Sequence, residues 1–151
     1  MSKADDEAII GIAMSMSRLH RERIAERAVL GRVLAAREGV WSGTPPFGYR
    51  RNTASKHLEA DSEEAQVVQE VFQLFADGNM SLREVAARVR GRIPRKDVDA
   101  RFIIRMLRNP VYIGKVVTSI GGQRIDASGA HEAIVDEDLW MTCNEGLRNT
   151  I

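Results

Sequence analysis

Residues 62–108 have the sequence SEEAQVVQEVFQLFADGNMSLREVAARVRGRIPRKDVDARFIIRMLR, which contains three consecutive segments of helical periodicity. The first segment extends to about Phe75, with apolar residues on one face and Glu or Gln residues on the other. Either Asp61 or Ser62 can cap its start, because their side-chain oxygens accept hydrogen bonds from the free amides of a first helical turn. The pattern therefore predicts an amphipathic helix that packs through one side.

Two shorter helices are expected after it. Ser81 and Glu84 have the spacing of a capping box, so a second helix should begin there and end near Gly91. After the loop RIPRK, Asp97 is the expected cap of a third helix that extends to about Leu107. Three helices with short connections predict a compact trihelical unit that resembles a helix-turn-helix, an arrangement that serves many functions.

The third helix separates charged from apolar side chains most clearly. At 100° per residue, Arg101, Arg105 and Arg108 fall within about 60° of one another. The opposite side carries four apolar residues, which are Phe102, Ile103, Met106 and Leu107. No acidic residue follows four positions after any of these arginines, so that kind of helical ion pair would not neutralise the stripe. We predict that this helix contacts nucleic acid; the alternative is a solvated helix face.

A much longer helix precedes this unit. Between about Asp5 and Glu38 only Gly11 and Gly31 disfavour a helix, each by about 1 kcal/mol, and Gly39 can cap its end. A helix of some thirty residues is about 50 Å long, so we expect it to project from a small domain; a core helix lying across the domain is the alternative. Apolar residues spaced by three and four form a seam for another helix, and they are Ile9, Ile12, Met16 and Leu19.

The stretch WSGTPPFGYRRN, residues 41–52, lies between the long helix and the trihelical unit. Its two prolines favour an extended backbone and exclude a helix, while its two glycines permit tight bends. Arg50 and Arg51 would neutralise phosphates. Three aromatic residues are expected to anchor the segment to the protein: Trp41, Phe47 and Tyr49. The sequence predicts a stiff, bent and extended connector over residues 39–56.

The remaining sequence alternates strand and helix signals. Residues 111–120 and 123–128 flank a GG turn and predict an antiparallel hairpin. Asp136 can cap a final helix with Leu139, Trp140 and Cys143 facing inward. The predicted fold is therefore mainly α with a small antiparallel β element (α+β).

The net charge of +1 conceals a segregation of charges along the chain. Residues 18–37 contain six basic and two acidic residues, and residues 81–115 contain ten basic and three acidic ones. Residues 57–77 and 126–145 each contain six acidic residues and no Lys or Arg. Basic segments that converge in space attract a polyanion, whereas each segment could also be a solvated helix face.

Sequence motifs for catalysis are absent, including phosphate loops, dinucleotide fingerprints, paired metal histidines and nucleophile elbows. The single cysteine, Cys143, excludes an internal disulfide and a Cys-based zinc site, and His131 has no second ligand at metal spacing. We expect both residues to be structural, and no catalytic residue, metal or cofactor. Without a membrane-span pattern or a secretory signal, the chain is expected to be cytoplasmic.

Several ordered segments together resemble the recombinase domain of large serine recombinases, the family of phage integrases and transposon resolvases. They lie within residues 30–142 and are GRVLAAREGVW, GTPPFGY, EAQVVQEVFQLFADGNMSLREVAARV, RFIIRMLRNPVYIGK and HEAIVDEDLW. LRNPVYIGK is the most specific of them. The first thirty residues are similar to the end of the helix that joins the catalytic domain of that family to the recombinase domain.

The resemblance implies a DNA-binding part of a site-specific recombinase, bacterial or phage-encoded, without the family's nucleophile domain, zinc ribbon or catalytic residues. It implies an interdomain and oligomerisation helix over residues 1–38, the basic connector over 39–56 and the recombinase domain over 57–151. The expected ligand is duplex attachment-site DNA, with other recombinase subunits as partners of the Ile9, Ile12, Met16 and Leu19 seam.

The residues expected to contact DNA are all basic and come from four parts of the chain. They are Arg32, Arg37, Arg50, Arg51, Arg92, Arg95, Lys96, Arg101, Arg105, Arg108 and Lys115. Two alternatives use the same residues differently. A helical protein-interaction module would pair its basic segments with acidic ones, and a free-standing transcriptional regulator would bind a promoter.

Overall fold

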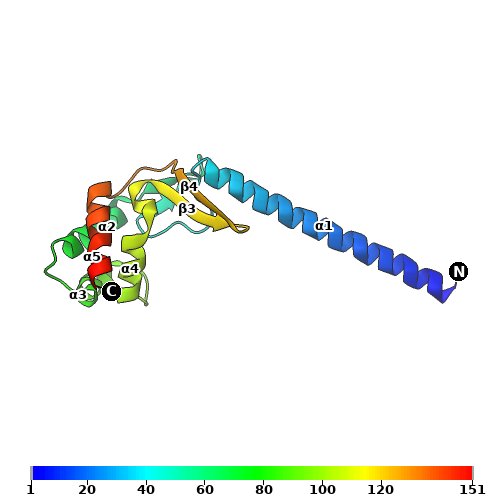
Figure 1. Ribbon diagram of the computed structural model, residues 1–151, viewed down its shortest axis with the longest axis horizontal. Coiled ribbons are helices and arrows are strands. Elements are labelled where there is room, and N and C mark those ends of the chain that lie inside the picture. Colours follow the sequence, from blue (N-terminus) through cyan, green and yellow to red (C-terminus); the bar gives the residue numbers. More distant parts are fainter. Residues whose placement is uncertain (1, 151) are drawn as a thin grey trace.

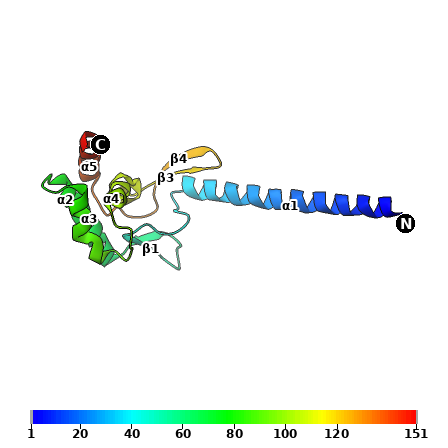
Figure 2. The same cartoon turned by 90° about the horizontal axis from the view of Figure 1, so that it is seen from below.

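The computed structural model describes residues 2–150 and consists of a long projecting helix joined to a smaller folded domain (Figure 1). Helix α1, Lys3–Arg37, begins with a capping box between Ser2 and Asp5. Its 35 residues correspond to about 52 Å. Most of that length extends away from the other elements in two perpendicular views (Figure 1; Figure 2). The predicted projecting helix is therefore confirmed, and the alternative of a helix lying across the domain is wrong.

The last turns of α1 pack against a β-hairpin. Strands β3, Lys115–Ile120, and β4, Gln123–Ser128, pair antiparallel from Lys115↔Ser128 to Ile120↔Gln123. A small apolar cluster joins helix and hairpin, and its buried members are Val33, Ala36, Val116 and Ile125. Gly39 closes this junction with φ +80, and a Cβ there would overlap the carbonyl oxygen of Ser128. The C-terminal turns of α1 are thus closely packed against the domain, whereas solvent surrounds the rest of the helix.

The trihelical unit is built from α2, Ser62–Ala76, α3, Leu82–Val89, and α4, Ala100–Arg108. Asp61 caps α2 and a Ser81–Glu84 capping box begins α3, as predicted. The predicted cap of the third helix is wrong, because Asp99 and not Asp97 accepts the hydrogen bond from Phe102. Val98, which is only 1% exposed, occupies the core just before this helix and so delays its start.

The unit shares one hydrophobic core with the C-terminal helix α5, Glu137–Thr150, which packs against α2 and α4. Residues with no more than 1% exposure form the centre of this core: Val68, Val71, Phe72, Val85, Ala86, Val89, Val98, Ile103, Leu107, Val111, Cys143 and Leu147. As predicted, Cys143 faces inward, and Leu139 and Trp140 pack against the core in partly buried positions. Because α4 lies between α3 and α5, only its remaining side can face solvent.

Two short 3-10 helices connect these elements. The helix η1, Arg90–Arg92, follows α3, and η2, Pro110–Ile113, follows α4. The predicted first strand of the hairpin therefore begins four residues late, because Asn109 caps η2 and Gly114 then turns the chain with φ +77. The second strand has the predicted bounds. The expected fold class, mainly α with a small antiparallel β element, is confirmed.

The connector differs from the extended path that the sequence predicted. Strand β1, Tyr49–Arg51, pairs antiparallel with β2, Leu58–Ala60, so the end of the connector and the residues that follow it form a hairpin. Its turn depends on the Asn52 carboxamide, which accepts hydrogen bonds from two backbone amides, and on Lys56 at φ +61. Tyr49 is buried, and Trp41 and Phe47 pack against the core, so the predicted anchoring role of the aromatic residues is confirmed.

Candidate nucleic-acid interface

One side of α4 presents three arginines to solvent. The opposite side is fixed by four residues that are at most 7% exposed, namely Phe102, Ile103, Met106 and Leu107. That rotation leaves Arg101, Arg105 and Arg108 exposed. None of the three forms an ion pair with a residue of the described chain, 2–150. These residues are here called the arginine face of α4, and their common orientation is as predicted.

The loop before α4 adds cations, of which Arg95 is paired. Its guanidinium donates two hydrogen bonds to Asp97, at 3.0 and 3.1 Å, and its Cζ lies 5.4 Å from the centre of the Phe102 ring. The hydrogen bonds from Arg95 lower the pKa of the Asp97 carboxyl, and Arg105 adds a small coulombic contribution. Lys96 is exposed between them. Asp97 thus partly neutralises this end of the predicted interface.

Two other predicted cations form exposed ion pairs. Arg92 pairs with Glu70 of α2, whose carboxylate also lies 3.8 Å from Arg88. The Lys115 ammonium lies 3.2 Å from the Glu137 carboxylate. Exposed pairs of this kind contribute about 0–1 kcal/mol. A phosphate could therefore replace either carboxylate at small cost in free energy.

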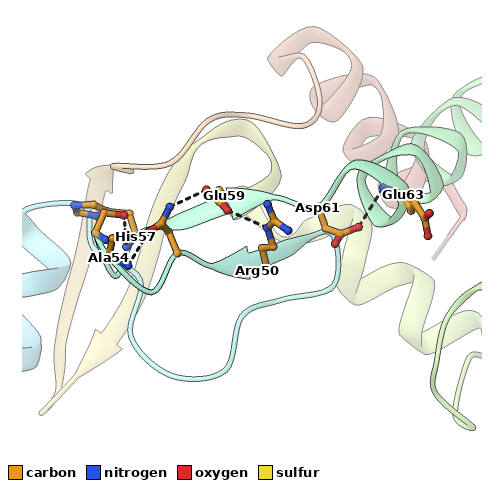
Figure 3. A network of polar contacts seen from close by, with 8 residues as sticks. Arg50, Ala54, His57, Glu59, Asp61 and Glu63 are labelled. Atoms are coloured by element: carbon orange, nitrogen blue, oxygen red, sulfur yellow. Dashed lines mark hydrogen bonds and ion pairs between the residues drawn. The ribbon is translucent and has the colours of Figure 1, made fainter.

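Arg50 and Arg51 contact the hairpin to which they belong. Figure 3 shows Arg50 donating to Glu59, at 2.9 Å, across the β1–β2 pair. Glu59 also accepts from Asn52, whose amide is the main cause of the lowered pKa of this carboxyl. Arg51 donates to three backbone carbonyls, those of Trp41, Gly43 and Lys56. Both guanidinium groups thus hold the connector in its folded shape, a use that the sequence did not predict.

Arg32 and Arg37 lie at the other end of the domain, where α1 meets the β3–β4 hairpin. Arg37 donates to the Gln123 side chain at 3.5 Å, and Arg32 is exposed. Helix α1 contacts β3 and β4, whereas α4 contacts α3 and α5 (Figure 1). The predicted cations are therefore dispersed: one group lies on α4 and its preceding loop, another lies at the α1–hairpin junction, and Arg50 and Arg51 lie on the β1–β2 hairpin.

A cationic cleft that the sequence did not predict lies between α3 and the start of α4. It has a volume of about 400 Å³ and is lined by Arg83, Ala86, Arg90, Asp99, Ala100 and Arg101. This is the α3–α4 cleft. The sequence signal for it is the seven-residue spacing of Arg83, in the first turn of α3, and Arg90, which caps the end of that helix and begins η1. The contribution of Arg101 depends on how α3 and α4 pack.

The apolar seam of α1 is exposed throughout. Its members are 53–66% accessible and have no partner within residues 2–150: Ile9, Ile12, Met16 and Leu19. Exposed aliphatic side chains on an isolated helix are typical of a surface that another helix covers. The predicted seam is therefore available for contact.

Residues with reactive or metal-binding side chains have structural surroundings. Within residues 2–150, no group of three or more His, Cys, Asp or Glu residues could hold a metal ion. Burial raises the pKa of the Cys143 thiol to about 11, and the thiol donates to the Phe72 carbonyl. His131 is buried, with Nε2 2.8 Å from the Val111 carbonyl oxygen. Among the described helices, none is both long and apolar enough to cross a membrane.

Two solved structures have similar folds. The crystal structure of an LSR–DNA complex aligns with a TM-score of 0.67 and 20% identity over 82% of this chain. A structure from work on the sequence requirements of the Listeria innocua prophage attP site aligns with a TM-score of 0.66 and 22% identity over 81% of this chain. The present chain spans 39% and 51% of their respective lengths.

The family comparison concerns the domain that follows the connector. The sequence model described as Recombinase matches residues 62–150, which include α2, α3, α4, the β3–β4 hairpin and α5. The match covers more than half of the chain and contains the arginine face of α4. It agrees with the resemblance carried by the sequence motifs. The chain therefore belongs to the Recombinase family.

Proposed function

We propose that this chain binds duplex DNA as the recognition part of a site-specific serine recombinase, with α4 in the major groove. The observation that carries the proposal is the arginine face of α4, formed by Arg101, Arg105 and Arg108. These side chains are exposed and free of ion pairs within residues 2–150, while the opposite side of the helix is held in the core. An exposed helix of this kind fits the major groove, in which guanidinium groups can read guanine.

The arrangement of α3 and α4 supports the same proposal. The two helices pack together, and the second of them carries the arginine face. In helix-turn-helix proteins the first helix crosses the DNA backbone and the second lies in the major groove. We assign these roles to α3 and α4. Cations with weak or no internal partners, such as Arg92 and Lys96, would contact flanking phosphates and contribute affinity without sequence selection.

The domain division follows from these assignments. Residues 57–151 would recognise the attachment site, residues 39–56 would position α1, and residues 1–38 would connect to other recombinase subunits. The described residues would supply recognition, and the cleavage chemistry of a recombinase would come from a different set of side chains. A chromosomal or phage DNA ligand would be met in the cytoplasm, whether the protein is bacterial or phage-encoded. The structures with the similar fold include a complex with DNA, which is consistent with this ligand.

Subunit contact through α1 is a second proposed function, favoured by one observation. The seam of Ile9, Ile12, Met16 and Leu19 is more than half exposed along a helix that projects from the domain. Two such helices could bury their seams against each other with knobs-into-holes packing. DNA binding and subunit contact use different parts of the chain, so both can hold.

A salt titration tests DNA binding. A duplex enriched from a random pool by repeated binding serves as the probe, and fluorescence anisotropy gives the affinity at several salt concentrations. Neutralising about six phosphates predicts a slope of about −5 for log affinity against log salt. A slope near zero, or the absence of any enriched duplex, would contradict the proposal. A homopolymer single strand of the same length is the control, and it should bind more weakly.

A further inference from the structure

The α3–α4 cleft has the charge of an anion-binding site. Three of its lining residues are arginines, Arg83, Arg90 and Arg101, and its one acidic lining residue is Asp99. The Asp99 carboxylate already accepts a hydrogen bond from the Phe102 amide, because it caps α4. None of the three arginines forms an ion pair within residues 2–150. The three arginines and Asp99 together give the lining of the cleft a net charge of +2.

The shape of the cleft follows from the spacing of its residues. Arg83 lies in the first turn of α3 and Arg90 is its C-cap, so the two are about two helical turns apart, and Ala86 of α3 lines the cleft with them. A methyl group at position 86 leaves room that a larger side chain would fill. Ala86 is itself only 1% exposed, so it forms the floor of the cleft where α3 approaches α4. The opening between the two arginines is thus built into the helix contact.

One of the arginines is held in place from within the protein. The Nε of Arg90 donates to the Val98 carbonyl at 3.1 Å, and its two Nη groups make no other hydrogen bond within residues 2–150. Val98 is fully buried, which fixes the position of that carbonyl. A guanidinium group that is already oriented loses less entropy when it binds an anion. Arg90, which lines the cleft, is therefore partly preorganised for binding an anion.

We propose that the α3–α4 cleft binds one phosphodiester of the DNA backbone and thereby fixes the position of α4 along the duplex. This inference rests on the proposed DNA-binding function and adds a specific contact that the arginine face alone does not provide. Guanidinium groups bind phosphate oxygens through paired hydrogen bonds, which gives geometric selection as well as charge attraction. The cleft lies beside the first turn of α4, so a phosphate held there borders the groove that α4 enters.

Arg88 provides a matched control for this site. It belongs to the same helix as Arg83 and is also exposed, but it lies near Glu70 and does not line the cleft. The test uses the full chain with the enriched duplex and with a random duplex of equal length. Arg83→Gln should weaken binding to both duplexes by about tenfold, because a charge-assisted hydrogen bond is lost, and should make the salt slope shallower by about one. Arg88→Gln should change affinity by less than about twofold.

Ethylation interference locates the phosphate itself. Wild-type protein should show a backbone position at which ethylation blocks binding, and the same modification should have no further effect on Arg83→Gln. Arg83→Lys keeps the charge but loses the paired donors, so it should remain weaker than wild type by several-fold. Circular dichroism melting of each variant checks that the fold is retained, since Arg83 is exposed.

The outcomes separate this inference from the proposal on which it rests. If wild-type protein binds the duplex but Arg83→Gln and Arg88→Gln are equivalent, the cleft is not a phosphate site, although the DNA-binding function stands. If Arg83→Gln loses affinity only for the enriched duplex, Arg83 reads a base and the phosphate assignment is wrong. If wild-type protein binds no duplex, the proposed function itself fails.

Discussion

The hydroxyl group of Tyr112 donates a hydrogen bond to the carbonyl oxygen of Phe47, 2.7 Å away, and so ties the connector to the segment that follows α4. Tyr112 also stacks on Tyr49, with ring centres 6.0 Å apart, and the Tyr49 hydroxyl shares its one proton between the carbonyl oxygens of Glu132, at 2.8 Å, and Val111, at 3.1 Å. Burial raises the pKa of both phenols. The connector is therefore an integral part of the folded domain.

Removing this contact should destabilise the domain. Tyr112→Phe deletes the hydroxyl and leaves the Phe47 carbonyl without that partner, so the free energy of unfolding should fall by about 1–3 kcal/mol. Urea denaturation followed by circular dichroism measures the change. Thr142→Val is the control, because the Thr142 hydroxyl makes a local bond on an exposed helix surface. Equal effects of the two substitutions would show that the Tyr112 bond has no special role.

Arg105 lies in the middle of the arginine face and should contribute to sequence selection. Arg105→Ala should weaken binding to the enriched duplex by about 1–3 kcal/mol if this residue reads a base, and should weaken binding to random DNA much less. Anisotropy on both duplexes measures the difference. Arg148→Ala, on the exposed side of α5, is the control. Equal losses on the two duplexes would make Arg105 a phosphate contact.

The turn after α1 should tolerate no side chain at Gly39. A Cβ there would overlap the Ser128 carbonyl oxygen, and φ +80 is itself unfavourable for other residues. Gly43 has a similar backbone, with φ +90, but its Cβ would meet nothing within 4 Å. Gly43→Ala should therefore cost about 1–2 kcal/mol of strain, and Gly39→Ala should cost clearly more. Urea denaturation measures the loss in the free energy of unfolding for each variant. Equal losses would show that the steric overlap with Ser128 adds nothing to the backbone strain.

The seam of α1 should promote self-association through one side of the helix only. Met16 belongs to the seam and is 66% exposed, whereas Met14 is 68% exposed on nearly the opposite side. Met16→Asp should shift the sedimentation profile toward monomer, because it places a charge in the apolar contact. Met14→Asp should have little effect. A wild-type protein that is monomeric at all concentrations, or equal effects of the two variants, would contradict the assembly proposal.

Stability should decrease at alkaline pH, partly through Cys143. Burial raises the pKa of this thiol from its ordinary value of 9.0 to about 11 in the folded protein. As the pH rises, the thiol therefore loses its proton in the unfolded chain before it does so in the folded protein. The contribution of Cys143 to the free energy of unfolding is constant below about pH 9 and falls between about pH 9 and 11, by at most about 1.4 kcal/mol per pH unit. The tyrosines act in the same direction at higher pH. Cys143→Ala should flatten the decline between pH 8.5 and 10 in urea denaturation; an unchanged slope would contradict the assignment.

Local signals in the sequence predicted the helices well. The Ser81–Glu84 capping box and the Asp61 cap depend on residues only a few positions apart, so the sequence contains the whole interaction. The choice between Asp97 and Asp99 depended on a distant contact, because burial of Val98 decides where α4 begins.

The misjudged parts depend on contacts between distant segments. The β1–β2 strands have three residues each, too short for a period-two pattern to be recognised. Their turn uses a positive φ at Lys56, which is uncommon for lysine. The α3–α4 cleft exists only when Arg83 and Arg101 come from packed helices. The sequence could therefore identify the arginine face, which one helix defines, but not the cleft, which two define.

Helix α1 contacts the domain only near its C-terminal end, so a small rotation there moves its N-terminal end by a large distance. Its contact with the β3–β4 hairpin begins at about Val29, so about 40 Å of helix extends beyond the domain. A change of about 10° in the angle at that contact would displace the first turn by about 7 Å. The direction in which α1 projects therefore depends on the packing of Val33 and Ala36 against the hairpin and on the absence of a side chain at Gly39.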